Sequence, residues 1–210
     1  MKATVLAFVV AAMAVIGSAS VQAGVVLSNM GATGLNDTSG PTNTDILASN
    51  WIGASFTTGA TAQQLDWVSI VGFNNDVGNK QVFLYADIGG SPGPRIANTI
   101  GTAVSGKNVY QFNFVGPRLS AATTYWILPE AGLSWYMEST LAAPTAQNSS
   151  GFSYNGVKTS TDSGSSWSAT SPFNYTLGIS TSDAPPVPEP AITSLVCLGG
   201  IAFMRRRMKK

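Results

Sequence analysis

Residues 81–87 of this chain read Gln-Val-Phe-Leu-Tyr-Ala-Asp, and they decide its fold class. Side chains at alternating positions of a β-strand point to opposite faces of the sheet. Here both sets of alternating positions are apolar, with Val82 and Leu84 in one set and Phe83 and Tyr85 in the other. We therefore expect this strand to lie centrally in its sheet. Residues 88–94 contain three glycines and two prolines, and they predict a tight turn after this strand.

Other short segments rich in aromatic and β-branched residues recur between clusters of Gly, Asn, Ser and Pro. The alternation places Tyr110, Phe112 and Phe114 on one face of a strand, and it places Phe173, Tyr175, Leu177 and Ile179 on one face of a closing strand. Further strands are expected at residues 25–27, 51–58, 64–73, 95–100, 123–128 and 134–137, and a hairpin at residues 156–168. No helical period of useful length appears. The sequence thus predicts an all-β fold, an antiparallel β-sandwich of jelly-roll-like form.

Composition limits what the body of the chain, residues 24–182, can do. It holds five Lys and Arg against eight Asp and Glu, a net charge of −3, so it offers no cluster of cations to nucleic acid. The chain has no histidine, and its one cysteine, Cys197, lies outside the body. Without histidine and cysteine, the body cannot contain a Ser-His-Asp or Cys-His catalytic site, a histidine or thiolate metal site, or a disulfide. We expect no catalytic residue, no metal and no cofactor.

The first 23 residues are typical of a secretory signal peptide. Lys2 precedes an apolar stretch over residues 3–16, the expected signal-peptide helix, and small residues follow up to Ala23. We expect the export machinery to deliver the chain to signal peptidase, which would cut between Ala23 and Gly24. The alternative is a buried helix at residues 3–16, and the small-residue cleavage pattern argues against it.

The last 24 residues have the order of a membrane-targeting tail. A linker at residues 183–190 ends in Val187, Pro188, Glu189 and Pro190; an apolar run at residues 191–204 follows; and residues 205–210 carry Arg205, Arg206, Arg207, Lys209 and Lys210. The apolar run can enter lipid as a single helix, and the cations keep the chain end in the cytoplasm. At ~1.5 Å per residue this helix would be about 21 Å long, against a hydrocarbon core of ~30 Å. A transient, processed anchor therefore fits better than a permanent one.

This tail resembles the PEP-CTERM sorting signal of Gram-negative bacteria, in which a Pro-Glu-Pro motif, one hydrophobic segment and an Arg-rich end stand in the same order. The resemblance implies export and recognition of Pro188, Glu189 and Pro190 by a membrane-embedded processing enzyme of the exosortase type. It also implies removal of the tail and delivery to the cell surface or an extracellular polysaccharide matrix. The alternative is an ordinary tail anchor, for which neither proline nor glutamate is needed.

A second resemblance covers most of the body, from about residue 27 to residue 179. Its strongest parts are the turn Tyr85-x-Asp87-x-x-Gly90-x-Pro92-Gly93 and the strand Thr124-Tyr125-Trp126. With these motifs the body is similar to the choice-of-anchor R domain, an exported β-domain found joined to different surface-anchoring tails. The similarity implies a β-sandwich outside the cytoplasm and no enzymatic activity.

Aromatic residues are the main candidates for ligand contact, because sugar rings pack their C–H faces on indoles. Trp51, Trp67 and Trp126 lie in strand patterns, and we expect them in the core. The possible ligand contacts are those in Gly- and Ser-rich surroundings, namely Trp135, Tyr136 and Trp167.

Two acidic constellations have simpler interpretations than the chemistry that they suggest. Asp87 with the following glycines could present oxygens to Ca²⁺, but one carboxylate is too few, and we expect it to cap the turn. Glu130 and Glu138 could form a glycosidase pair, but their spacing shows no such geometry, and we expect two solvated glutamates.

We therefore expect an exported, non-catalytic β-domain that passes transiently through the inner membrane and reaches the cell surface or extracellular matrix. Its expected role is structural or adhesive in envelope or biofilm polysaccharide. The alternative is a lectin-like carbohydrate-binding module. A hydrolase is a third possibility, disfavoured by the missing histidines.

Overall fold

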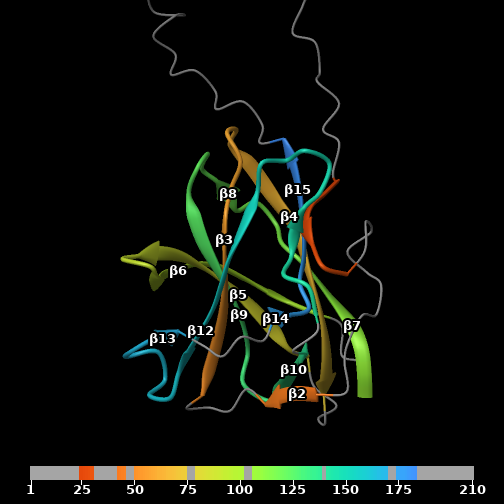
Figure 1. Cartoon of the computed structure of the whole chain (residues 1–210), viewed down its shortest axis with the longest axis vertical. Coiled ribbons are helices and arrows are strands. Elements are labelled where there is room, and N and C mark those ends of the chain that lie inside the picture. Colours follow the sequence, from red (N-terminus) through yellow and green to blue (C-terminus); the bar gives the residue numbers. More distant parts are fainter. Residues whose placement is uncertain are drawn as a thin grey trace, which may run out of the picture.

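The computed structural model describes residues 24–30, 42–45, 50–74, 79–101, 106–138, 141–169 and 174–183. Across these ranges the chain forms β-strands joined by turns, without a helix, and the strands make two antiparallel sheets (Figure 1). The predicted all-β class is confirmed. The expected helices at residues 1–23 and 191–204 lie outside the described residues. Within the described ranges, no helix is long and apolar enough to cross a membrane.

The larger sheet has nine strands in the part of the chain that the structure describes. Its main path runs through β11 (Thr145–Ala146), β1 (Gly24–Ser28), β15 (Gly178–Asp183), β4 (Gln63–Asn74), β10 (Leu133–Glu138) and β14 (Asn174–Tyr175). β7 (Gly106–Asn113) and β8 (Arg118–Leu119) also pair with β4, and β2 (Thr42–Asp45) pairs with β10. The long strand β4 thus connects most of this sheet.

The smaller sheet has six strands within the described ranges. Their order is β13 (Ser168–Ala169), β12 (Ser153–Ser160), β3 (Trp51–Thr57), β9 (Thr124–Pro129), β5 (Gln81–Ile88) and β6 (Ser91–Ile100). The expected interior position of residues 81–87 is confirmed, because β5 lies between β9 and β6. The hairpin expected at residues 156–168 is also confirmed, since Thr159 of β12 pairs with Ser168 of β13.

The turn after β5 is shorter than the sequence suggested. Only Gly89 and Gly90 separate β5 from β6, with φ angles of 61° and 78°. A two-residue hairpin turn with both φ angles positive favours residues without a Cβ atom. The prolines of residues 88–94 belong to β6, where they are tolerated because β6 is the edge strand of this sheet.

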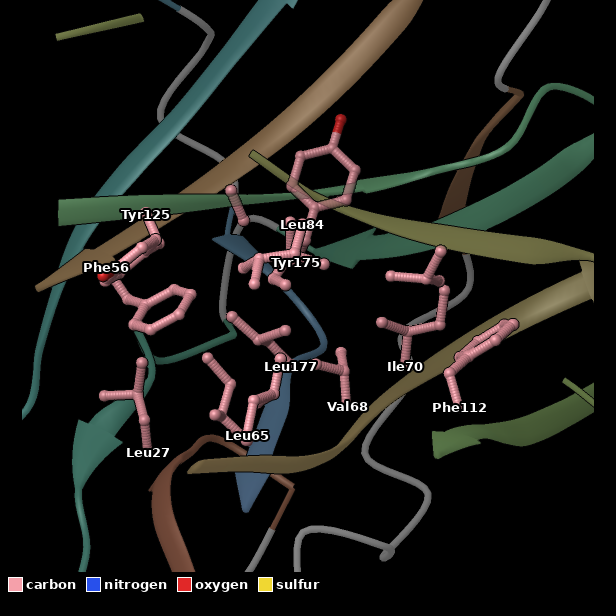
Figure 2. Packing of buried hydrophobic residues seen from close by; sticks show 14 of the residues in the cluster. Leu27, Phe56, Leu65, Val68, Ile70, Leu84, Phe112, Tyr125, Tyr175 and Leu177 are labelled. Carbon is pink, nitrogen blue, oxygen red and sulfur yellow. The ribbon is translucent and has the colours of Figure 1, made fainter. Parts of the chain in front are cut away.

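The hydrophobic core lies between the two sheets (Figure 2). The smaller sheet contributes Ile52, Ala54, Phe56, Val82, Leu84 and Ile127, and the larger sheet contributes Leu27, Leu65, Val68, Ile70, Phe112 and Ile179. Figure 2 shows several of these side chains directed toward one another from the two layers. The expected burial of Tyr110, Phe112 and Phe114 is confirmed, with exposed fractions of 3%, 0% and 6%.

The closing strand expected at residues 173–179 is divided in two. β14 stays beside β10, and β15 lies between β1 and β4. Thr176 stands between them: its backbone N–H donates to the carbonyl of Tyr136 (3.2 Å), and its hydroxyl accepts from the N–H of Val71 (2.9 Å). Of the four apolar side chains expected in the core there, three are buried and Phe173 lies outside the described residues.

Both ends of the described body lie at one end of the fold. Gly24 in β1 pairs with β15, and Asp183 at the end of β15 pairs with Gln63 at the start of β4. β3 leads into β4 at this same end. Trp51, at the beginning of β3, therefore lies at the opposite end of that strand, about 20 Å away at ~3.3 Å per residue.

Candidate functional site

The outer face of the smaller sheet carries aromatic side chains that do not belong to the core. In β5, Val82 and Leu84 point into the core with no exposed surface, while Phe83 and Tyr85 point to the other face and are half-buried. Trp126 of β9 lies on the same outer face, because its neighbours in the strand point inward. Both faces of β5 are thus apolar, as the sequence showed, but only one of them packs into the core.

A cavity of about 300 Å³ opens on this face. Its lining consists of Trp51, Phe83, Tyr85, Leu128, Pro129, Glu130 and Ala131. The volume lies at the lower end of the ~300–1,000 Å³ that is typical of small-molecule sites, and the mainly apolar lining with a few polar groups is typical of them as well. We call this the β5 cavity.

Glu130 is the charged residue in the described lining of the β5 cavity, and Arg95 lies nearby but outside that lining. One carboxylate oxygen of Glu130 accepts a hydrogen bond from the backbone N–H of Gln81 at 2.9 Å, which fixes the carboxylate in place. On the β6 side, the guanidinium carbon of Arg95 lies 5.4 Å from the ring centroid of Phe83. Burial raises the pKa of the Tyr85 hydroxyl, and the positive charge of Arg95 opposes that rise. Tyr85 therefore remains a neutral hydrogen-bonding group beside the cavity.

The turn between β12 and β13 packs against the same face. Gly164 adopts a φ of 88°, and a Cβ atom there would lie 2.7 Å from the indole of Trp51. Trp167 donates its Nε1–H to the carbonyl of Gly164 at 3.1 Å, and its ring lies 6.5 Å from that of Trp126. The turn thus positions one side of Trp51 and covers Trp126, which is only 3% exposed.

Hydrogen bonds to one carboxylate hold this turn. Asp162 accepts from the backbone N–H of Ser166 (2.8 Å), from the Ser166 hydroxyl (2.6 Å) and from the Ser160 hydroxyl (2.7 Å). These bonds, those from the Ser166 and Ser160 side chains first, lower the pKa of Asp162 from 3.8 to about 2.

A pH dependence of this turn follows from that shift. Because the pKa of Asp162 is lower in the folded state, its contribution to stability is present above pH 3.8 and is lost as the pH falls toward 2. Asp162→Asn keeps an acceptor oxygen but cannot accept from the Ser166 hydroxyl through its NH₂ group. We expect this variant to have a lower Tm than the wild type at pH 7, and the difference to shrink as the pH approaches 2. Thermal unfolding followed by tryptophan fluorescence measures both; an equal difference at every pH would contradict the assignment.

Asp87 caps the turn after β5, as expected. Its Oδ2 accepts from the backbone N–H of Gly90 at 3.0 Å, and its Oδ1 accepts from the indole N–H of Trp126 at 2.7 Å. Among the described residues no group of three or more Asp, Glu, His or Cys side chains is placed to hold a metal ion. Asp87 therefore acts as a structural acceptor that orients Trp126.

The structure does not bring the three predicted ligand contacts together. Trp135 has no exposed surface, and its ring centroid lies 4.9 Å from that of Tyr175. Its Nε1–H donates a hydrogen bond to the carbonyl of Thr176 at 2.7 Å. It belongs to the core and leaves none of its ring to a ligand. Tyr136 is half-buried on the outer face of the larger sheet, with the ammonium of Lys107 5.3 Å from its ring. Of the three, only Trp167 lies on the face that carries the β5 cavity.

The predictions for the other tryptophans and for the two glutamates are confirmed only in part. Trp126 is buried as expected, although on the outer face of its sheet, whereas Trp51 and Trp67 are only half-buried. Glu130 lies at the β5 cavity, while the side chain of Glu138 lies outside the part that the structure describes. The targeting residues at both ends of the chain, 1–23 and 184–210, also lie outside it.

The residues that line the β5 cavity were not singled out together by the sequence. Phe83 and Tyr85 were visible as a second apolar face, and that face was the available signal. Trp51 and Leu128 come from strands that are far away in sequence, and only strand pairing brings them beside β5.

Comparisons with known proteins add no family to this description. No protein-family model matches the chain. No curated protein matches it in sequence either. The two resemblances described above therefore stay predictions.

Proposed function

We propose that this chain is an exported, non-catalytic protein of the cell surface or extracellular matrix, with a structural or adhesive role in polysaccharide. The observation that carries the proposal is the order of the C-terminal segments: the Val187–Pro190 motif, an uncharged apolar run and a cationic end. The proposal includes processing by an exosortase-type enzyme and a place among proteins with PEP-CTERM tails and choice-of-anchor R domains. Signal peptidase, the export machinery and, transiently, the inner membrane are its partners.

The body is compatible with such a role. Its core draws side chains from both sheets, which supports the finer assignment of a jelly-roll-like β-sandwich. The strand β15 ends at Asp183, so few residues separate the folded body from the proposed processing motif. The absence of histidine from the sequence supports a non-catalytic role.

A lectin-like carbohydrate-binding module is the second candidate. It is favoured by the half-buried rings of Trp51, Phe83 and Tyr85 around one cavity on the outer face of the smaller sheet. Aromatic rings beside a few fixed polar groups are the arrangement that sugar-binding sites use. The two candidates are compatible, since adhesion to a polysaccharide requires contact with it.

Replacing Glu189 by Ala tests the sorting proposal. The change leaves the apolar run and the cations untouched, so membrane entry should barely alter. It removes the one charged group that a recognition site could pair with in the motif. We expect full-length precursor to accumulate in the inner membrane, while the wild type is trimmed and reaches the surface or matrix fraction. Intact-mass analysis of fractionated cells measures both.

A nearby carboxylate supplies a matched control. Asp183→Ala removes an exposed negative charge at the first residue of the linker and leaves the motif intact, so we expect processing like that of the wild type. If Glu189→Ala is also released and trimmed, Pro188–Pro190 is no processing signal, and the tail is a plain anchor or has another role.

A further inference from the structure

We propose that the β5 cavity binds one neutral hexopyranose residue of a polysaccharide chain. This inference rests on the proposed carbohydrate-binding function and deepens it, because it names the site and the class of sugar. It also moves the site away from two of the aromatic residues that the sequence favoured, Trp135 and Tyr136.

The walls of the cavity suit the apolar faces of a sugar ring. Trp51 and Phe83 are half-buried and line the same cavity, with Leu128 between their strands. A hexopyranose has C–H groups on its faces and hydroxyls around its rim, so it packs its faces on aromatic rings and directs its hydroxyls outward. The alkyl chain of a lipid would use the apolar walls but not the polar groups beside them.

The polar groups suit the hydroxyls of a neutral sugar. The Glu130 carboxylate is held by Gln81 through one oxygen and retains further acceptor capacity for hydroxyl donors. Tyr85 also lines the cavity and supplies a neutral hydroxyl that can donate or accept. Arg95 lies over the ring of Phe83, outside the lining. A carboxylate acceptor and a neutral hydroxyl thus border a single ring-sized space of about 300 Å³.

Among the described residues, Glu130 is the one charged residue in the lining of the cavity, and it favours a neutral sugar over a uronate. Glu130 lines the cavity, and a sugar carboxylate placed beside it would meet a like charge at short range. The net charge of −3 over residues 24–182 adds repulsion at longer range. A neutral hexose meets neither of these costs.

The position of the cavity suits a tethered protein. Trp51 lies at the end of β3 that is remote from Asp183, where the chain continues toward the tail. The separation of about 20 Å along the strand leaves the cavity clear of whatever holds the C-terminal end.

Fluorescence titration of the exported protein, purified from the cells that make it, tests the site. The probes are neutral tetrasaccharides of glucose, mannose and galactose, and a tetrasaccharide of galacturonate. We expect saturable binding of at least one neutral probe and weaker binding of the galacturonate probe. Phe83→Ala should raise the Kd of that neutral probe about tenfold, the equivalent of about 1.4 kcal/mol. Val115→Ala shortens a side chain that is 99% exposed and does not line the cavity, so it should leave the Kd unchanged.

A second variant keeps the proposal testable if Phe83→Ala fails to fold. Glu130→Gln preserves the shape of the side chain and an oxygen that can accept from Gln81. We expect it to reduce the preference for the neutral probe over galacturonate several-fold, because the like charge is gone.

The outcomes separate this inference from the proposed function. Tighter binding of galacturonate would overturn the sugar class. Loss of binding in Tyr136→Ala, with Phe83→Ala unaffected, would overturn the site and leave a carbohydrate-binding protein. No binding of any probe by a protein that is nevertheless sorted to the matrix would overturn the site and the sugar class, and would leave the sorting proposal intact.

Discussion

Replacing Trp135 by Ala is expected to lower the free energy of unfolding by about 3–5 kcal/mol, the range found for removing a buried aromatic side chain. The ring has no exposed surface and packs against Tyr175, so its removal leaves a cavity in the core. It also leaves the carbonyl of Thr176 without the indole N–H that lies 2.7 Å away. Since small domains are stable by only ~5–15 kcal/mol, the variant would lose much of its stability. Denaturant unfolding measures the loss.

Two controls separate the ring from its N–H group. Trp135→Phe keeps most of the packing but loses the donor to Thr176, so we expect an intermediate loss. Val115→Ala alters a side chain that is 99% exposed and should change stability by no more than about 0.5 kcal/mol. A Trp135→Ala protein as stable as the wild type would mean that this indole is not a core residue, and its candidacy as a ligand contact would return.

Replacing Leu84 by Ala is expected to cost about 2–5 kcal/mol of stability, whereas the same change at the adjacent Phe83 should cost less. Leu84 is fully buried between the sheets, while Phe83 lies half-buried on the outer face and borders the β5 cavity. Phe83→Ala should instead weaken saccharide binding. Parallel unfolding and titration of the two variants measure this division.

Leu84 and Phe83 serve as controls for each other, because they are large apolar neighbours in one strand that point to opposite faces of the sheet. Equal losses of stability would mean that both faces of β5 are covered. That result would remove the physical basis for a binding site on the outer face.

Several features of this protein follow from its sequence because they depend on local patterns. The two-residue period predicted strands at residues 81–87 and 109–114, and these are the strands β5 and β7. The glycines and prolines of residues 88–94 predicted a turn after Asp87. The turn itself consists of two residues, where seven were expected. The proposals on export and sorting also rest on local order, namely the segments at residues 1–23 and 187–210.

The tertiary structure decided which apolar face meets the other sheet. Alternation shows that Val82 and Leu84 share one face and Phe83 and Tyr85 the other, but both faces are apolar, so hydrophobicity alone cannot choose between them. The choice is made by long-range packing. Trp135 is an example: its Gly- and Ser-rich surroundings suggested exposure, yet contact with Tyr175 and Thr176, some forty residues along the chain, places it in the core.

The β5 cavity could be found only in the folded chain. Trp51, Phe83 and Glu130 come from three separate parts of the sequence, and the pairing of β3, β9 and β5 sets them side by side. The turn that supports Trp51 comes from a fourth part, around Gly164. Local sequence determined the strands and their two faces, and the register between strands determined the site, because register depends on contacts between residues far apart in the chain.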